Sequence, residues 1–353
     1  MGAGERFQSK LVADVGDFEP GHFALVMATG ILSTAALSLG PIWLSRALLV
    51  VACVAFVGLC VLAAWRLVGW PRRMLADATT PGRAFTLLAF VAGSNVLASR
   101  LVQAGLTPIA EVLAAVGTVG WVVLTYLIPA RLIAAEPKAP FASAFNGTWL
   151  IWVVATQSVT ETLATVATQH PGQQDGLVFA SVVLWGLGVF LYLVLMATMV
   201  PRLLVAEDTP DHLTHPYWIT MGATAISVLA AARILALHVQ LSASLPPTVL
   251  TGIALMLWAF GSWWIPLLAV LEFWRHVLQR TPLRYEPSLW DVVFPLGMYA
   301  AASEAFGQVT GIPILVSIAH VEVWFAVVAW VATFAGMLVT AWLLFRRDVM
   351  QRE

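Results

Sequence analysis

Residues 177–200 have the sequence LVFASVVLWGLGVFLYLVLMATMV, which is 24 residues without a single charged side chain. An α-helix of about 20 apolar residues is long enough to cross the hydrocarbon core of a bilayer. A run of this length and composition therefore predicts a membrane-spanning helix.

The composition of the whole chain agrees with a membrane location. Of its 353 residues, 60% are hydrophobic and 10% are charged, whereas a soluble domain carries about a quarter charged residues. The 16 Trp and 17 Phe are typical of proteins with aromatic belts at the two membrane interfaces. A formal net charge of −1 indicates no attraction to nucleic acid. The composition predicts a polytopic, all-α membrane protein.

Similar apolar stretches recur along the chain, separated by helix breakers and charges such as those of Trp70-Pro71-Arg72-Arg73. The predicted spans are 20–39, 42–65, 84–104, 107–130, 143–167, 177–200, 215–236, 248–274, 288–307 and 320–345. Ten spans place both termini on one side of the membrane. The domain boundaries that follow are an N-terminal segment at 1–17, a ten-helix transmembrane domain at 18–347 and a C-terminal tail at 348–353.

The basic residues predict the orientation of these spans. Of the 18 Lys and Arg residues, 15 fall in the termini and in the connections from even to odd spans. Only Arg46, Arg100 and Arg233 lie elsewhere. Short loops rich in Lys and Arg stay in the cytoplasm, so both termini are expected there. The expected location is the inner (plasma) membrane of a bacterium.

The odd-numbered spans resemble one another and predict five repeated helical hairpins. Each has an aromatic residue near its start, and these residues are Phe23, Phe85, Trp149, Trp218 and Trp290, at intervals of 62, 64, 69 and 72 residues. Small or hydroxyl-bearing residues follow the aromatic, whereas the even-numbered spans are bulkier and apolar. Small residues let helices approach closely, so the odd helices are expected inside and the even helices outside. The alternative is that the small residues serve tight packing alone.

Two motifs add a resemblance to a known family. Residues 19–30 are EPGHFALVMATG and residues 294–300 are FPLGMYA. They resemble the first and ninth spans of the tellurite-resistance/dicarboxylate transporter family, which includes plant guard-cell slow anion channels, yeast malate permease and a fungal sulfite pump. The resemblance implies five helical hairpins in a quasi-fivefold bundle, a central pore in each protomer and a homotrimer. It also implies that Phe294, just before Pro295, plugs the pore.

The residues themselves provide a separate argument for Phe294 as a gate. A proline interrupts the backbone hydrogen bonds of its helix, and an aromatic ring that projects into a narrow pore forms a dewetted barrier. The alternative is that Phe294 is an ordinary core residue, one of 17 Phe in the chain.

Four charged residues in the odd spans form a second candidate constellation: Arg100, Glu161, Arg233 and Glu304, each 12 to 15 residues after the aromatic start of its span. A charge within a span is costly, so four at similar depth predict a water-filled vestibule. Arg233 is the candidate for direct anion contact, since its planar donors suit carboxylates and oxyanions. The alternative is a structural ion pair between Arg233 and Glu161 or Glu304.

Polar residues in the middle of the odd spans are candidate pore-lining groups, because hydroxyl and amide donors replace part of the hydration shell of an anion. They are Thr29, Ser33, Ser94, Asn95, Thr156, Gln157, Ser158 and Thr224, together with the small residue Gly297. The alternative for each polar side chain is a hydrogen bond between helices. The histidines show no His-Glu-x-x-His or similar spacing, so neither a metal nor a cofactor is expected.

These observations predict a transmembrane anion channel or transporter gated by a phenylalanine. The open substrates are small inorganic anions, C4-dicarboxylates such as malate, and oxyanions such as sulfite or tellurite. The alternative on the same fold is a proton-coupled carrier with Glu161 or Glu304 as the proton site. A membrane-embedded enzyme is less favoured, because the sequence shows no convergent nucleophile, base or metal ligands.

Overall fold

The computed structural model describes residues 16, 18–136, 144–205, 215–237 and 246–350. Within these ranges every regular element is helical. The long helices are α2 (Ala24–Leu39), α3 (Ile42–Gly69), α6 (Ala89–Gln103), α7 (Thr107–Ala134), α9 (Ile151–Ala167), α10 (Gln174–Val205), α11 (Ile219–Ala236), α12 (Pro247–Phe273), α13 (Trp290–Thr310) and α14 (Pro313–Met350). The short helices α4 (Pro71–Asp77) and α5 (Pro81–Ala84) connect α3 to α6.

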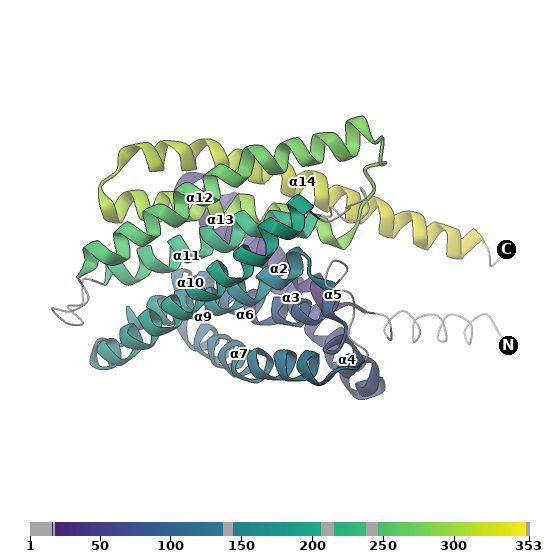
Figure 1. Ribbon diagram of the computed structural model, residues 1–353, viewed down its shortest axis with the longest axis horizontal. Coiled ribbons are helices and arrows are strands. Elements are labelled where there is room, and N and C mark those ends of the chain that lie inside the picture. Colours follow the sequence, from purple (N-terminus) through teal and green to yellow (C-terminus); the bar gives the residue numbers. More distant parts are fainter. Residues whose placement is uncertain (1–15, 17, 137–143, 206–214, 238–245, 351–353) are drawn as a thin grey trace.

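Consecutive long helices pack as antiparallel hairpins, and the first helix of each hairpin belongs to an inner ring. Contacts run from α2 to α6, from α6 to α9, from α9 to α11, from α11 to α13, and from α13 back to α2. The ring is therefore closed. The second helices, α3, α7, α10, α12 and α14, each pack on the inner helix of their own hairpin. The last hairpin, α13 and α14, packs against α2, and Figure 1 shows α12 on the other side of α13.

Burial separates the inner helices from the outer ones. The spans that contain α2, α6, α9 and α11 are 72 to 89% buried inside the protein, and those of the outer helices only 11 to 28%. The outer helices expose large apolar side chains such as Val54, Tyr126 and Phe190, which suits contact with lipid acyl chains. The prediction that odd helices lie inside and even helices outside is confirmed.

Nine of the predicted ten spans are matched by helices long and apolar enough to cross a membrane, among the residues that the structure describes. The predicted ninth span, 288–307, is the helix α13, which has 21 residues but does not belong to this set of nine. It carries Asp291, Glu304 and Gln308, and these polar side chains lower its hydropathy. It is nevertheless fully part of the inner ring.

A second closed ring lies where the inner helices begin. Each is preceded by a short 3₁₀ turn, and these turns are η1 (Pro20–Phe23), η2 (Phe85–Leu88), η3 (Gly147–Leu150), η5 (His215–Trp218) and η7 (Pro287–Leu289). Each turn contacts the next, and η7 contacts η1. A Cβ atom at Gly147 would lie 2.4 Å from the backbone carbonyl of Pro216, so only glycine allows η3 and η5 to pack this closely. The five inner helices thus start together and run parallel.

At least one arginine stands near the C-terminal end of each outer helix, at the end of the bundle where the inner helices begin. These residues are Arg66, Arg131, Arg202, Arg275 and Arg346. Cations at helix C-termini complement the helix dipole. We call this end, with the five 3₁₀ turns and these five arginines, the basic end.

The predicted terminal segments fall mostly outside the described residues. Of the segment 1–17, only residue 16 is described. Helix α14 continues to Met350, so the first residues of the predicted tail 348–353 are helical, and residues 351–353 lie outside the described part.

Candidate functional site

Phe294 lies on α13 at its contact with α11. Its side chain is 1% exposed, and Pro295 follows it inside the helix. Proline has no amide hydrogen, so the carbonyl of Asp291 has no helical partner at this point. A Cβ atom at Gly222 would lie 2.9 Å from Pro295 Cγ and 3.4 Å from Phe294 Cε1. Glycine at position 222 of α11 therefore leaves the space that Phe294 and Pro295 of α13 fill.

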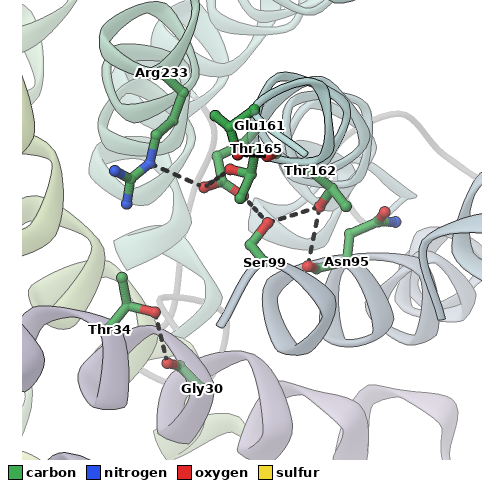
Figure 2. Close-up of polar contacts among 9 residues, drawn as sticks. Gly30, Thr34, Asn95, Ser99, Glu161, Thr162, Thr165 and Arg233 are labelled. Atoms are coloured by element: carbon green, nitrogen blue, oxygen red, sulfur yellow. Dashed lines mark hydrogen bonds and ion pairs between the residues drawn. The ribbon is translucent and has the colours of Figure 1, made fainter. Parts of the chain in front are cut away.

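Glu161 of α9 is the centre of a polar cluster in the half of the bundle farther from the basic end (Figure 2). Ser99 of α6 donates to Glu161 Oε2, and Thr165 Oγ1 donates to Oε1 at 3.2 Å. Arg233 Nε of α11 forms an ion pair with Oε1 at 3.3 Å. One buried carboxylate thus joins three neighbouring helices of the inner ring.

Arg233 contacts Glu161 through a single nitrogen. Figure 2 shows the two terminal nitrogens of the guanidinium pointing away from the carboxylate. The Arg233 side chain is 29% exposed and that of Glu161 only 6%. A bidentate Arg–carboxylate pair uses two parallel hydrogen bonds, and this contact does not. Arg233 can therefore hold Glu161 and still present donors to another anion.

Arg100 is buried beside hydroxyl groups and not beside a carboxylate. Its side chain donates to Ser33 Oγ at 2.9 Å and to Ser45 Oγ at 3.0 Å. The two serines also donate to each other's backbone carbonyls, at 2.7 and 2.6 Å. Arg100 is 2% exposed, and its Nη1 has no hydrogen-bond partner. Among the described residues no ion pair includes Arg100, so a positive charge stays uncompensated beside α2 and α3.

Glu304 of α13 is partly buried, and it lies in the same half of the bundle as Glu161 and Arg233. It accepts a hydrogen bond from Gln308 and interacts electrostatically with Arg233. The four charged residues predicted as one constellation are therefore arranged unequally. Arg233 and Glu161 are in direct contact, Glu304 is near Arg233, and Arg100 has partners of its own on α2 and α3.

A repeated tryptophan connects each of four outer helices to the inner helix of the next hairpin, and sequence reasoning missed it. These hydrogen bonds run from Trp121 of α7 to Thr156 Oγ1 (3.0 Å), from Trp185 of α10 to the Ser227 carbonyl (2.8 Å), from Trp258 of α12 to Ser303 Oγ (2.8 Å), and from Trp330 of α14 to Thr29 Oγ1 (3.0 Å). The four tryptophans are 64, 73 and 72 residues apart. That spacing matches the hairpin repeat and was the signal that could have identified them.

The other polar candidates make contacts with helix backbones. These bonds are Ser94 to Phe90 O (2.7 Å), Asn95 to Val91 O (2.9 Å), Gln157 to Trp185 O (3.1 Å), Ser158 to Ala155 O (2.7 Å) and Thr224 to Met221 O (2.7 Å). Glycines of the outer helices make room for three of these side chains: Gly117 for Asn95, Gly188 for Gln157 and Gly261 for Thr224. The hydrogen bonds of these five candidates thus lie within or between helices.

Gly297 lies at the contact between α13 and α2. A Cβ atom there would be 3.3 Å from Ile31 Cγ2 and 3.6 Å from the Leu32 nitrogen. Because Gly297 has no side chain, α13 packs closely on α2, and this contact closes the inner ring between the first and last hairpins.

Comparison with known proteins adds a family to this geometry. The family model described as voltage-dependent anion channel (SLAC1) matches residues 17–338. An uncharacterized membrane protein of Mycobacterium tuberculosis is 44% identical over 149 residues, which are 42% of this chain and 76% of the relative. An uncharacterized transporter of Methanocaldococcus jannaschii is 28% identical over 149 residues, which are 42% of each chain. The matched region of the family model includes every helix of the inner ring.

Proposed function

Because the chain belongs to the SLAC1 family of voltage-dependent anion channels, we propose that it conducts small anions along the axis of α2, α6, α9, α11 and α13. One observation carries this proposal: the five inner helices contact one another in a closed ring. A closed ring of helices surrounds an axis, and the outer helices separate that axis from lipid. In this proposal α13 completes a quasi-fivefold bundle of ten spans. Family membership implies transport and not catalysis.

Fixed positive charge supports the choice of anions. The N-termini of the inner helices meet at the basic end, where helix dipoles favour negative charge. In the opposite half, Arg233 presents free donors and Arg100 has no carboxylate partner among the described residues. A low-dielectric path between positive groups concentrates anions at its mouths. We assign the basic end to the cytoplasm, since short basic loops stay on that side.

Phe294 is the proposed gate. Its ring is buried within the inner ring of helices, and Pro295 and Gly222 hold α13 and α11 close together at this level. An apolar constriction excludes water and therefore excludes hydrated ions. The proposed trimer rests on the family alone, and native mass spectrometry in mild detergent would count the chains.

Reconstitution tests the function as a whole. Purified protein in liposomes, with and without Phe294→Ala, is expected to give anion currents whose reversal potentials follow the anion gradient. Chloride, nitrate, malate, sulfite and tellurite are compared in the same liposomes, which also identifies the substrate class. If neither the parent nor Phe294→Ala passes any of these anions, although both are folded and inserted, the proposal is wrong.

A proton-coupled carrier is the second candidate, and Glu304 is the observation that favours it. This carboxylate is half-buried near Arg233 and accepts a hydrogen bond from Gln308 of its own helix, whereas Glu161 is held by Ser99, Thr165 and a direct ion pair with Arg233. A carboxylate in such a position is able to take up and release a proton. A proton gradient imposed without an anion gradient distinguishes the two candidates. It drives anion flux in a carrier, Glu304→Gln abolishes that flux, and a simple channel shows none.

A further inference from the structure

Three potential metal ligands meet near the basic end, away from the charged cluster of the inner helices. His215 belongs to η5, Glu272 is at the end of α12, and His276 lies in a π-helical turn, Trp274–Leu278. One ligand atom of each side chain lies within 4.8 Å of the other two. We propose that these residues bind a divalent transition-metal ion of the Zn²⁺ type. The proposal is independent of the proposed transport function.

The two histidines have ring nitrogens available for a metal. His276 Nδ1 is 2.9 Å from the Thr281 carbonyl. A carbonyl only accepts hydrogen bonds, so Nδ1 carries a proton, and in the neutral ring Nε2 offers its lone pair to a metal. His215 Nδ1 is 3.0 Å from Ser288 Oγ, which leaves His215 Nε2 facing the cluster. Histidine ligands characteristically use their second nitrogen in this way to fix the ring.

The carboxylate of Glu272 is anchored in the same manner. Trp218 Nε1 donates to Glu272 Oε1 at 3.1 Å, and Oε2 is 3.1 Å from His276 Nε2. His276 Nε2 is buried and makes no hydrogen bond, so these two atoms are close without being aligned as donor and acceptor. Two ligand atoms of one tetrahedral ion are also close without bonding to each other, because the lone pair of each points at the ion. Metal–ligand bonds of about 2.0–2.2 Å place two such atoms about 3.3 Å apart.

A second histidine–glutamate contact shows how an ordinary hydrogen-bonded pair differs from the pair at the proposed metal site. His170 Nε2 is 2.6 Å from Glu111 Oε1 and forms an aligned hydrogen bond, with both side chains about 40% exposed. No third ligand accompanies this pair within the described residues. It is therefore an ordinary surface pair and a matched control for the proposed site.

The ligand set indicates which ions bind. Two imidazoles and one carboxylate suit Zn²⁺ and similar borderline ions, whereas Mg²⁺ and Ca²⁺ prefer oxygen ligands. Arg275 Nη1 lies 3.5 Å from His215 Nε2, and an ion at this nitrogen replaces that long contact. The nearby positive charge lowers the affinity for a cation. The structure therefore fits a site of moderate affinity, open to a water molecule as a further ligand.

An ion at this site connects three elements of the basic end. It joins η5, which begins α11, to the end of α12, and Ser288 connects it to η7, which leads into α13. Metal occupancy therefore stabilises the helix starts on both sides of the contact between Phe294 and α11.

Zn²⁺ titration of the purified, tag-free protein in detergent tests the site, with a chromogenic chelator as competitor. The background carries Cys53→Ser and Cys60→Ser, which removes the two thiols. One equivalent of Zn²⁺ is expected to bind per chain. Glu272→Gln keeps the acceptor for Trp218 but loses the charge, and it is expected to weaken binding about tenfold or more, as is His276→Ala. His170→Ala is expected to bind like the parent.

Two further readouts exclude a simple folding defect. The melting temperature without metal is compared among all variants, and only the parent and His170→Ala are expected to gain stability when Zn²⁺ is added. Co²⁺ in place of Zn²⁺ is expected to give a visible absorption band that Glu272→Gln changes. Absence of stoichiometric binding by the parent overturns the proposal. So does binding that is equal in the parent, Glu272→Gln and His276→Ala.

Discussion

Phe294 is the residue whose substitution distinguishes a gate from a core side chain. If its ring closes the path, Phe294→Ala lets water enter and is expected to raise anion conductance many-fold, with anion selectivity retained. A purely structural Phe294 predicts the opposite result, since truncation of a buried Phe lowers stability by about 3–5 kcal/mol in a soluble core. Single-channel recording in planar bilayers measures the change. Phe306 is the matched control, because it is equally buried on the same helix, and Phe306→Ala is expected to leave conductance unchanged.

Substitution of Arg233 likewise distinguishes a role in anion conduction from a purely structural role. Its loss leaves Glu161 with hydrogen bonds from Ser99 and Thr165, so Arg233→Ala is expected to fold with a lower melting temperature. Conductance is expected to fall severalfold, because a fixed charge has left the path. Adding Glu161→Gln removes the unpaired charge and is expected to restore the melting temperature but not the conductance. Recovery of both properties in the double variant indicates an ion pair that is only structural.

At the scale of the elements, the repeated tryptophan bonds hold neighbouring hairpins in order. Trp330→Phe removes the bond to Thr29 and is expected to lower the free energy of unfolding by about 1 kcal/mol, since hydrogen bonds between membrane helices contribute about 0.6–2 kcal/mol. Chemical denaturation in mixed micelles measures this, and a double-mutant cycle with Thr29→Val is expected to be non-additive. Trp324 is exposed on the same helix, and an equal loss in Trp324→Phe contradicts a specific role for the Trp330 bond.

For the whole molecule, the orientation is the decisive prediction. The inner helices start together and the outer helices return, so every even-to-odd connection lies at the basic end. A reporter fused after Glu353, or inserted between Arg72 and Arg73, is expected to be active only in the cytoplasm. An insertion at Gln173, in the short turn Pro171–Gln173 before α10, is expected to report the outside. The reverse pattern contradicts the orientation, and activity of the Glu353 and Arg72/Arg73 reporters on opposite sides of the membrane contradicts the number of spans.

Much of this architecture could be predicted from the sequence, since it depends on local composition. Apolar length predicts the spans, and small residues on alternate spans predict which helices lie inside. Helix α13 shows where this reasoning weakens. Asp291, Glu304 and Gln308 lower its hydropathy, so the inner position predicted for span 288–307 depends on its aromatic start and its FPLGMYA motif, and its contacts with α11 and α2 confirm that position.

The side-chain partners were decided by the tertiary structure alone, because they depend on the rotation and distance of helices far apart in the chain. The shared distance from the aromatic starts predicted that Arg100 belongs to a charged vestibule, and in the structure its hydrogen-bond partners are Ser33 of α2 and Ser45 of α3. Glu272 and His276 are one helical turn apart in sequence, and only the packing of η5 against α12 brings His215 to them. The sequence by itself determined which helices are inner and which are outer, since that depends on the residue composition of each helix taken separately. Only the tertiary structure decided which polar groups meet, since that requires the closed ring.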